Sequence, residues 1–153
     1  MNSPKQIIIA KKDAVFWLDR HGQWHNQAGA FKHKKIIDHF HASIQKDKNG
    51  YHLFQSRGDH TEKVYFNYED TALFVFDLIS EKDEIILVLN TRKKMKLEPH
   101  QLFIKDDNLY VRSDNDRIKF TERALLQISK LIDYENDQYV LNVSNGRFLI
   151  ASN

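Results

Sequence analysis

The sequence predicts an α+β fold, mainly antiparallel, made of duplicated hairpin–helix–hairpin units. Three observations predict it. Short apolar runs alternate with turn residues, as in hairpins. Two longer stretches place apolar residues at helical spacing. The same order of these features occurs twice along the chain, which is the sequence signature of an internal repeat.

The spacing of the two repeats is closely matched. Trp17 to Trp24 and Phe103 to Tyr110 each span 7 positions (24−17 and 110−103). A constant offset of 88 positions relates the apolar residues that follow, pairing Ile37 with Leu125, Phe40 with Ile128, Ile44 with Ile132 and Tyr51 with Tyr139. Two such units would create an interface where a ligand could bind, so the repeat is also a functional observation.

The first repeat is expected to contain two hairpins and one helix. Ala14–Asp19 and Gln23–His25 form a predicted hairpin, in which Gly22 supplies a permissive turn backbone. Lys32–Lys46 is a predicted amphipathic helix, ended by Lys48-Asn49-Gly50. Polar turn residues 57–60 then separate the last two predicted strands, which are Tyr51–Ser56 and Lys63–Phe66.

A central hairpin is expected between the repeats. Its strands are Leu73–Ile79 and Ile85–Leu89, and their unbroken apolar runs are typical of strands that are covered on both faces. We therefore expect three segments: 1–68 as the first half, 69–98 as a bridging hairpin and loop, and 99–153 as the second half.

The second repeat follows the same plan. Thr121 is a competent N-cap for a helix that reaches about Ile132, with Glu122 in its first turn. The strands expected around this helix are Gln101–Lys105, Leu109–Arg112, Arg117–Phe120, Tyr139–Val143 and Arg147–Ile150.

The composition limits the classes of function that the protein can have. The chain has 153 residues, of which 41% are hydrophobic, so it can bury a real core as one domain or as two small halves. Cysteine is absent, which excludes disulfides and thiolate chemistry. The net charge of +2 gives no reason to expect nucleic acid, and no apolar run approaches a signal peptide or a membrane span. We expect a cytoplasmic protein without a membrane partner.

Motifs for metal, cofactor or catalytic chemistry do not stand out. The closest histidine pairs, His21 with His25 and His39 with His41, do not have metal-ligand spacing, so no metal site is expected. Nucleotide loops and nucleophile elbows are also missing, so we expect no cofactor and assign no catalytic residue. The basic cluster Arg92-Lys93-Lys94-Met95-Lys96 is a solvated loop or a phosphate contact, and the sequence leaves its role open.

The chain resembles a bacterial family called domain of unknown function 1285. The likeness spans nearly the whole chain, and its specificity lies in the order and spacing of short motifs. The matching residues are Gly22-Gln23-Trp24, Gly29, Phe40, Gly50-Tyr51-His52-Leu53, Glu62-Lys63, Thr91, His100, Leu102-Phe103-Ile104, Val111-Arg112, Arg123 and Ser144-Asn145-Gly146-Arg147-Phe148.

This resemblance implies a duplicated core whose second half is pleckstrin-homology-like, with a ligand site between the halves. A nucleotide-like anion in signalling is the implied ligand. The residues carried over by position are Glu62, Lys63, Thr91, His100, Arg112 and Arg123. Lysine and arginine side chains bind phosphate, arginine in a bidentate geometry, and a threonine hydroxyl donates a hydrogen bond.

Alternatives of other classes remain. A protein-interaction module would capture a peptide at an exposed strand edge. A small hydrolase would use His100 with Glu62 or another carboxylate, provided that these side chains converge. Lipid binding by analogy with pleckstrin-homology domains is the weakest, because fold likeness does not carry function. The sequence does not determine the oligomeric state.

Overall fold

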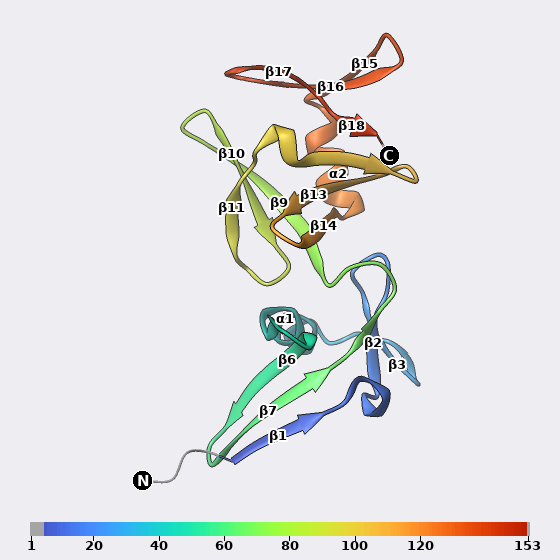
Figure 1. Cartoon of the computed structure of the whole chain (residues 1–153), viewed down its shortest axis with the longest axis vertical. Coiled ribbons are helices and arrows are strands. Elements are labelled where there is room, and N and C mark those ends of the chain that lie inside the picture. Colours follow the sequence, from blue (N-terminus) through green and yellow to red (C-terminus); the bar gives the residue numbers. More distant parts are fainter. Residues whose placement is uncertain (1–4, 153) are drawn as a thin grey trace. The chain divides into compact units, whose positions relative to one another are not determined.

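Each half of the chain places an α-helix between groups of β-strands (Figure 1). The computed structural model describes residues 5–152, so the ends of the outer predicted segments, residues 1–4 and 153, lie outside the described residues. Two units divide the chain, Met1–Ala72 and Leu73–Asn153, and the central hairpin lies in the second of them. Most strand pairs are antiparallel, which confirms the α+β class.

The first unit contains helix α1 and two four-stranded sheets within residues 5–72. One sheet has the order β1-β7-β6-β5 and the other the order β4-β3-β2-β8. The bounds are β1 Lys5–Ile9, β2 Phe16–Leu18, β3 Trp24–Asn26, β4 Gly29–Ala30, α1 Lys34–Ala42, β5 Ile44–Asp47, β6 Gly50–Arg57, β7 His60–Tyr65 and β8 Asn67–Tyr68, with a 3-10 turn η1 at Lys11–Asp13.

The core of the first unit is largely aromatic. Trp24 and Phe66 are almost fully buried, and their rings meet edge to face with centroids 5.0 Å apart. Phe16 and Phe40 pack against Trp24 at 5.7 and 5.3 Å, also edge to face. Such pairs add to the stabilisation from area burial, so this cluster holds the small sheet β4-β3-β2-β8 against α1.

The first helix is shorter than the sequence predicts. The predicted range ends at Lys46, but α1 ends at Ala42 and Ile44 begins strand β5. The reason is local: the Ser43 hydroxyl donates to the His39 carbonyl at 2.7 Å, and Ile44 then pairs with Leu53 in the sheet. Lys48-Asn49-Gly50 consequently belongs to a hairpin turn between β5 and β6 rather than to a helix cap.

The second unit contains helix α2, a seven-stranded sheet and a three-stranded sheet within residues 73–152. Their orders are β11-β10-β9-β14-β13-β12-β18 and β15-β16-β17. The bounds are β9 Leu73–Glu81, β10 Glu84–Leu89, β11 Lys94–Lys96, η2 Pro99–Gln101, β12 Leu102–Lys105, β13 Asn108–Ser113, β14 Asp116–Phe120, α2 Glu122–Ser129, β15 Ile132–Glu135, β16 Gln138–Val143, β17 Gly146–Leu149 and β18 Ala151–Ser152.

The core of the second unit is mostly aliphatic. Ala124 and Ile128 of α2 are completely buried against strands β9, β13 and β14, which contribute Val75, Val111 and Ile118 among others. The predicted N-cap is confirmed, since the Thr121 hydroxyl oxygen accepts a hydrogen bond from the Ala124 N–H. The helix ends at Ser129 instead of Ile132, because Ile132 pairs with Leu141 in the three-stranded sheet.

Three hairpins of the second unit turn through residue pairs with positive φ. The pairs are Lys82-Asp83, Asp106-Asp107 and Asn136-Asp137, with φ between 49° and 65°. Two consecutive left-handed residues define the type I′ turn, whose twist matches that of paired strands. Asn and Asp tolerate this backbone better than other non-glycine residues, which explains their presence at these turns.

The two units share one order of elements and pairings. In each, a hairpin and a third strand precede the helix, a three-stranded meander follows it, and a last short strand pairs in parallel with the first: β8 with β2, and β18 with β12. The offset of 88 recurs in β5 and β15, which span 44–47 and 132–135. It also recurs in two hydrogen bonds, Phe54 N–H to Ser43 O and Asn142 N–H to Leu131 O.

Candidate functional site

The six predicted site residues are distributed over both units. Glu62 and Lys63 lie on β7 of the first unit. The other four lie in the second unit: Thr91 after β10, His100 in η2, Arg112 on β13 and Arg123 in the first turn of α2. The predicted site between the two halves stays a prediction.

Lys63 belongs to a polar cluster around Asp47, the last residue of β5. The Lys63 ammonium lies 3.1 Å from the Asp47 carboxylate, and the Tyr65 hydroxyl donates to the same oxygen at 2.7 Å. The Tyr65 hydrogen bond is the main reason that the pKa of Asp47 falls well below its ordinary value, with further contributions from the Asn49 N–H and Lys63. Lys63 is therefore already paired with a carboxylate.

Glu62 points to the opposite face of β7, as alternation along a strand requires. Its carboxylate accepts from the Arg57 guanidinium at 2.8 Å and lies 3.6 Å from the His60 ring. The Arg57 side chain is 58% exposed, so this is a solvated ion pair at the end of the β6–β7 hairpin. Glu62 and Lys63 thus contact separate partners.

His52, which was not among the predicted site residues, is the most deeply buried polar side chain near Lys63. It is 2% exposed, its Nδ1 lies 3.3 Å from the Gly50 carbonyl, and its ring lies 5.1 Å from the Tyr65 ring. Its Nε2 has no hydrogen-bond partner within the described residues. The signal available in the sequence was its position in the Gly50-Tyr51-His52-Leu53 motif of the resemblance.

Thr91 lies in the tight turn that joins β10 to β11. Its hydroxyl oxygen is buried and has no hydrogen-bond partner among the described residues. The preceding Asn90 is 3% exposed and exchanges two hydrogen bonds with the Phe74 backbone, at 2.9 and 3.0 Å. Arg92 adopts a φ of 75°, and its N–H returns to the Leu89 carbonyl at 2.9 Å. The Thr91 hydroxyl is thus held on a well-fixed backbone.

Arg112 lies over an aromatic pair on the face of the large sheet that points away from α2. Its guanidinium carbon is 4.6 Å from the centroid of the Phe103 ring, which stacks on Tyr110 at 5.1 Å. Arg117 of the neighbouring strand lies over Tyr110 at 5.0 Å. Stacking of this kind restricts the orientation of a guanidinium.

These arginines border a hollow of about 390 Å³ in the second unit. Its lining is mixed in charge, with Lys105, Arg112 and Arg117 as cations and Asp114 and Asp116 as carboxylates. Phosphate and carboxylate groups suit the cations, while hydroxyl and amine groups suit the aspartates. The hollow therefore offers contacts to a ligand that carries both kinds of group.

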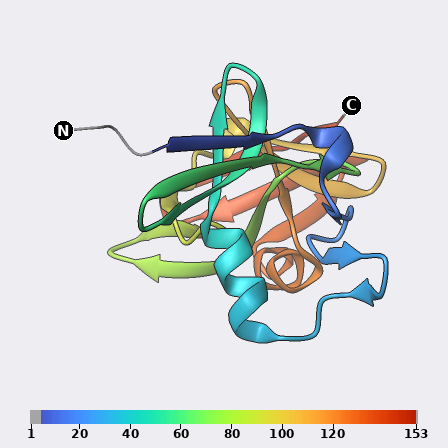
Figure 2. The ribbon, with the colours of Figure 1, turned by 90° about the horizontal axis from the view of Figure 1, so that it is seen from below.

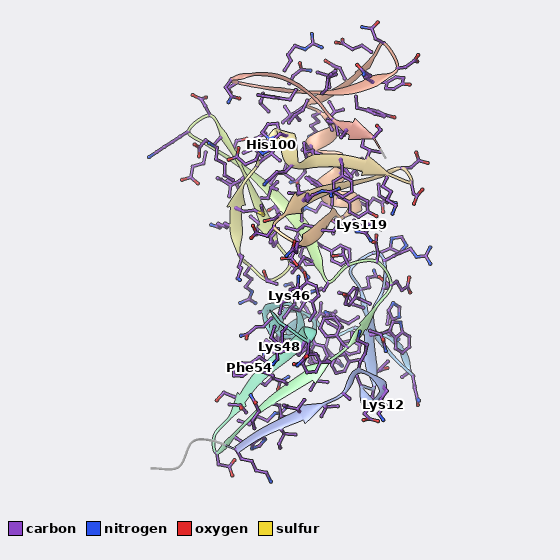
Figure 3. The ribbon with its side chains drawn as sticks, viewed as in Figure 1. Lys12, Lys46, Lys48, Phe54, His100 and Lys119 are labelled. Carbon is purple, nitrogen blue, oxygen red and sulfur yellow. The ribbon has the colours of Figure 1, made fainter. Side chains whose placement is uncertain are left out.

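Arg123 and His100 do not join Arg112. Arg123 lies on α2, and its 75% exposed side chain is 3.9 Å from Asp77 of β9. Because α2 packs on the face that contains Val111, the next residue, Arg112, points to the opposite face. His100 is exposed in η2, directly before β12 (Figure 3). Thr91 and Arg112 are three strand positions apart in the sheet order, roughly 14 Å at the usual strand spacing.

Two further predicted features lie at the ends and edges of sheets. Residues 57–60, predicted as a polar turn, form the β6–β7 turn, with Gly58 at a φ of 62°. In the basic cluster, Lys96 pairs with Glu84 at 3.3 Å on the edge of the large sheet. Residues 5–152 contain no group of three or more His, Asp or Glu side chains placed to hold a metal ion. No helix in the described part of the chain has the length and apolar character needed to span a membrane.

Comparison with known proteins gives matches in structure only. No family model and no curated protein matches the sequence. The crystal structure of a DUF1285 family protein from Silicibacter pomeroyi DSS-3 matches 97% of this chain and 84% of its own, with a TM-score of 0.63 at 13% identity. A second, from Shewanella baltica OS155, matches 76% of this chain and 91% of its own, with a TM-score of 0.53 at 14% identity. The chain therefore has the fold of the DUF1285 family proteins, which confirms the predicted resemblance at the level of the fold.

Proposed function

We propose that this protein is a binding module for a small anionic, nucleotide-like ligand, with Arg112 as its main anchor. The observation that carries the proposal is the Arg112 guanidinium, held 4.6 Å over the Phe103 ring at the rim of a hollow of about 390 Å³. A pocket of this size falls in the range typical of small-ligand sites, roughly 300–1,000 Å³.

The chemistry of the hollow favours a ligand with phosphate and hydroxyl groups. Arg112 and Arg117 are both stacked on rings, so their positions are restricted before a ligand arrives. A phosphate oxygen would accept from Arg112 and Lys105, while Asp114 or Asp116 would accept from a sugar hydroxyl or a base amine. The outer face of a guanidinium is itself a stacking surface for a planar base.

The other candidate residues are supported either by the structure or by the resemblance alone. The buried hydroxyl of Thr91 has no hydrogen-bond partner within residues 5–152, which supports a role as a donor to a ligand. The resemblance is the only support for the remaining four residues, which are Lys63, Glu62, His100 and Arg123. Two of them, Lys63 and Glu62, already have partners of opposite charge. A cytoplasmic location and a role in signalling are part of the same proposal.

Duplication of an ancestral unit is also proposed. Its support is the shared order of strand pairings, including the parallel pairs β2–β8 and β12–β18, and the offset of 88. A pleckstrin-homology-like second unit is supported by its seven-stranded sheet with one helix packed against it, within residues 73–152. Crystal structures in which the two units fail to superpose strand for strand would contradict duplication.

A titration of the full chain tests the anion site. Adenosine monophosphate, cyclic dinucleotides and inorganic phosphate are added to isotope-labelled protein, and amide shifts are followed by NMR. Binding should perturb amides of β12, β13 and β14, and Arg112→Gln should weaken it about tenfold or more, as expected for loss of a charge-assisted, bidentate contact. Thermal stability should rise with ligand concentration in the wild type.

Two arginine controls make the result specific. Arg147 is 56% exposed and pairs with Glu135, so Arg147→Gln should bind like the wild type. Arg123→Gln distinguishes the residues implied by the resemblance from those that line the hollow. An equal loss of binding in this variant would support the full set implied by the resemblance. Binding that is unaffected by Arg112→Gln would refute the proposed anchor.

A protein-interaction module is the second candidate. Its specific support is the three-stranded sheet, both of whose edge strands expose an apolar side chain: Tyr134 on β15 and Leu149 on β17, each 61% exposed. Unpaired strand edges are templates for added strands. A stoichiometric peptide partner whose binding is lost in a β17 edge variant, in the absence of any nucleotide effect, would favour this function.

A further inference from the structure

An apolar groove in the first unit lies between the β3–β4 hairpin and the start of α1. Its volume is about 370 Å³, and its wall is formed by Ala28, Ala30, Phe31, Ile36 and Phe40. Figure 2 shows the loop that leads from β4 into α1. The groove shares no residue with the hollow around Arg112.

The wall of the groove is anchored in the core. The Phe31 and Phe40 rings meet edge to face with centroids 5.0 Å apart, and Phe40 also packs on Phe16 at 5.0 Å. The Phe31 N–H donates to the Trp24 carbonyl at 2.9 Å, which fixes the backbone beside the groove. Ile36, unlike the two phenylalanines, is 47% exposed. Its apolar side chain therefore faces solvent at the mouth of the groove. A preformed apolar surface of this kind binds without a large ordering cost.

The rim of the groove carries the positive charge of Lys32. His33 also lines it, and no carboxylate among residues 5–152 does so. Lys32 has no ion-pair partner in the part of the chain that the structure describes. Lys34 is engaged with Asp38 at 2.6 Å, four residues along the helix. The unpaired charge beside the apolar wall is therefore positive, which selects anions over cations.

We infer that this groove binds a small amphiphilic carboxylate, with its apolar body against Phe31, Ile36 and Phe40 and its carboxylate at Lys32. The volume lies at the lower end of the usual range for ligand pockets, roughly 300–1,000 Å³, so one or two fused rings would fill it. Burial of an apolar body supplies the affinity, and the charge sets the orientation. This site is separate from the phosphate-binding function proposed for the second unit.

Amide NMR on the full chain tests the inference with three matched probes. 2-Naphthoate has the ring and the negative charge, 2-naphthylmethylammonium has the ring with the opposite charge, and acetate has the charge without the ring. Naphthoate should saturate and shift amides of residues 28–36, while the other two should bind at least about tenfold more weakly.

Variants of exposed residues locate the contacts without threatening the core. Lys32→Gln should weaken naphthoate binding about fivefold, the upper range for an exposed charge pair, and Ile36→Ala by a similar factor through lost apolar contact. Lys12→Gln, at an exposed position in η1 between β1 and β2 (Figure 3), should leave binding unchanged. Leu126→Ala is the matched control for Ile36, since Leu126 is 65% exposed on α2.

Several results would overturn the inference. Equal affinity for the naphthyl cation and anion would remove the role of Lys32. Shifts centred outside residues 28–36, or unchanged affinity in both Lys32→Gln and Ile36→Ala, would place the probe elsewhere. Binding to anionic vesicles without saturable naphthoate binding would assign the surface to lipid instead. These readouts do not depend on the nucleotide site proposed at Arg112, so a failure of that proposal would leave them unchanged.

Discussion

His41 illustrates how the environment of one residue sets its charge. It is 2% exposed on α1, and its Nδ1 accepts a hydrogen bond from the Trp24 indole N–H at 3.3 Å. Burial lowers the pKa of His41 from 6.5 to about 4, although Asp38 and the Gly22 backbone oppose this shift. The imidazole is therefore neutral at physiological pH and serves as a core residue.

This pKa predicts a pH-dependent stability. The unfolded chain gains a proton on His41 as the pH falls through 6.5, whereas the folded chain does so only near 4. The stabilising contribution of the neutral ring is thus complete above about pH 6.5 and is lost progressively toward pH 4, by roughly 3 kcal/mol in all. Urea unfolding of His41→Gln at several pH values should show a flatter profile than the wild type. His39→Gln, an exposed neighbour, should keep the wild-type slope, and an unchanged slope in His41→Gln would contradict the assignment.

Residue types predicted which side chains are chemically able to bind anions, but not which of them are available. Lys63 and Arg112 are both cations of the same motif set, yet Lys63 is paired with Asp47 while Arg112 is stacked over Phe103 at the rim of a hollow. Asp47 lies 16 positions from Lys63 in the sequence. Such pairings depend on strand register, which residue identity alone does not specify.

At the scale of elements, local signals located the helices and turns but overestimated helix length. Both predicted helices continued into strands, β5 and β15, since Ile44 and Ile132 fit the helical period. Pairing with Leu53 and Leu141 decided their structure instead, because a long-range strand pair outweighs a weak local preference. Strand β1 was not predicted, and its partner β7 lies more than 50 positions away.

Removal of the N-cap of α2 should measurably lower the free energy of unfolding. The Thr121 hydroxyl accepts from the Ala124 N–H at 3.3 Å and donates to the Val75 carbonyl at 3.1 Å. Thr121→Ala should lower the free energy of unfolding by about 1 kcal/mol, measured by urea denaturation. Thr121→Ser retains the hydroxyl and should recover most of this loss. Equal destabilisation by both substitutions would exclude the cap as the cause.

At the β15–β16 turn, we expect one substitution of Asp137 to raise the stability of the fold and another to lower it. Asp137 has a φ of 62° and follows Asn136 at 52°, as a type I′ turn requires. Asp137→Gly should stabilise the fold by roughly 0.5–1 kcal/mol, since glycine adopts this conformation without steric cost. Asp137→Val should destabilise it by about 1–2 kcal/mol. Thermal denaturation would compare the two, and a more stable Val variant would show that this turn does not hold its left-handed pair.

At the scale of the whole molecule, two units have related topology but different cores. The first is built around aromatic rings, including Trp24, Phe40 and Phe66, and the second around aliphatic side chains such as Val111 and Ile128. Corresponding positions in two such cores can hold different apolar residues because total volume and hydrophobic pattern matter more than residue identity.

Equivalent core positions in the two units should have comparable importance. Leu53 and Leu141 are 88 positions apart, 1% and 0% exposed, on the corresponding strands β6 and β16. Leu53→Ala and Leu141→Ala should each lower the free energy of unfolding by about 2–5 kcal/mol. Hydrogen exchange should show the lost protection mainly in the substituted unit. Leu149→Ala, at an exposed position, should cost less than about 0.5 kcal/mol. A similarly small effect at Leu53 or Leu141 would contradict its assignment to a core.

The sequence by itself determined the α+β class, the repeated order of elements, the N-cap of α2 and the resemblance to a family whose fold the protein shares. These follow from periodicity, turn chemistry and motif order, which are properties of neighbouring residues. Only the tertiary structure decided that Lys63 is neutralised by Asp47, that Arg112 and Arg123 lie on opposite sides of a sheet, and that Lys32 borders an apolar groove. Strand register and packing between distant segments create these relations, and no local pattern encodes them.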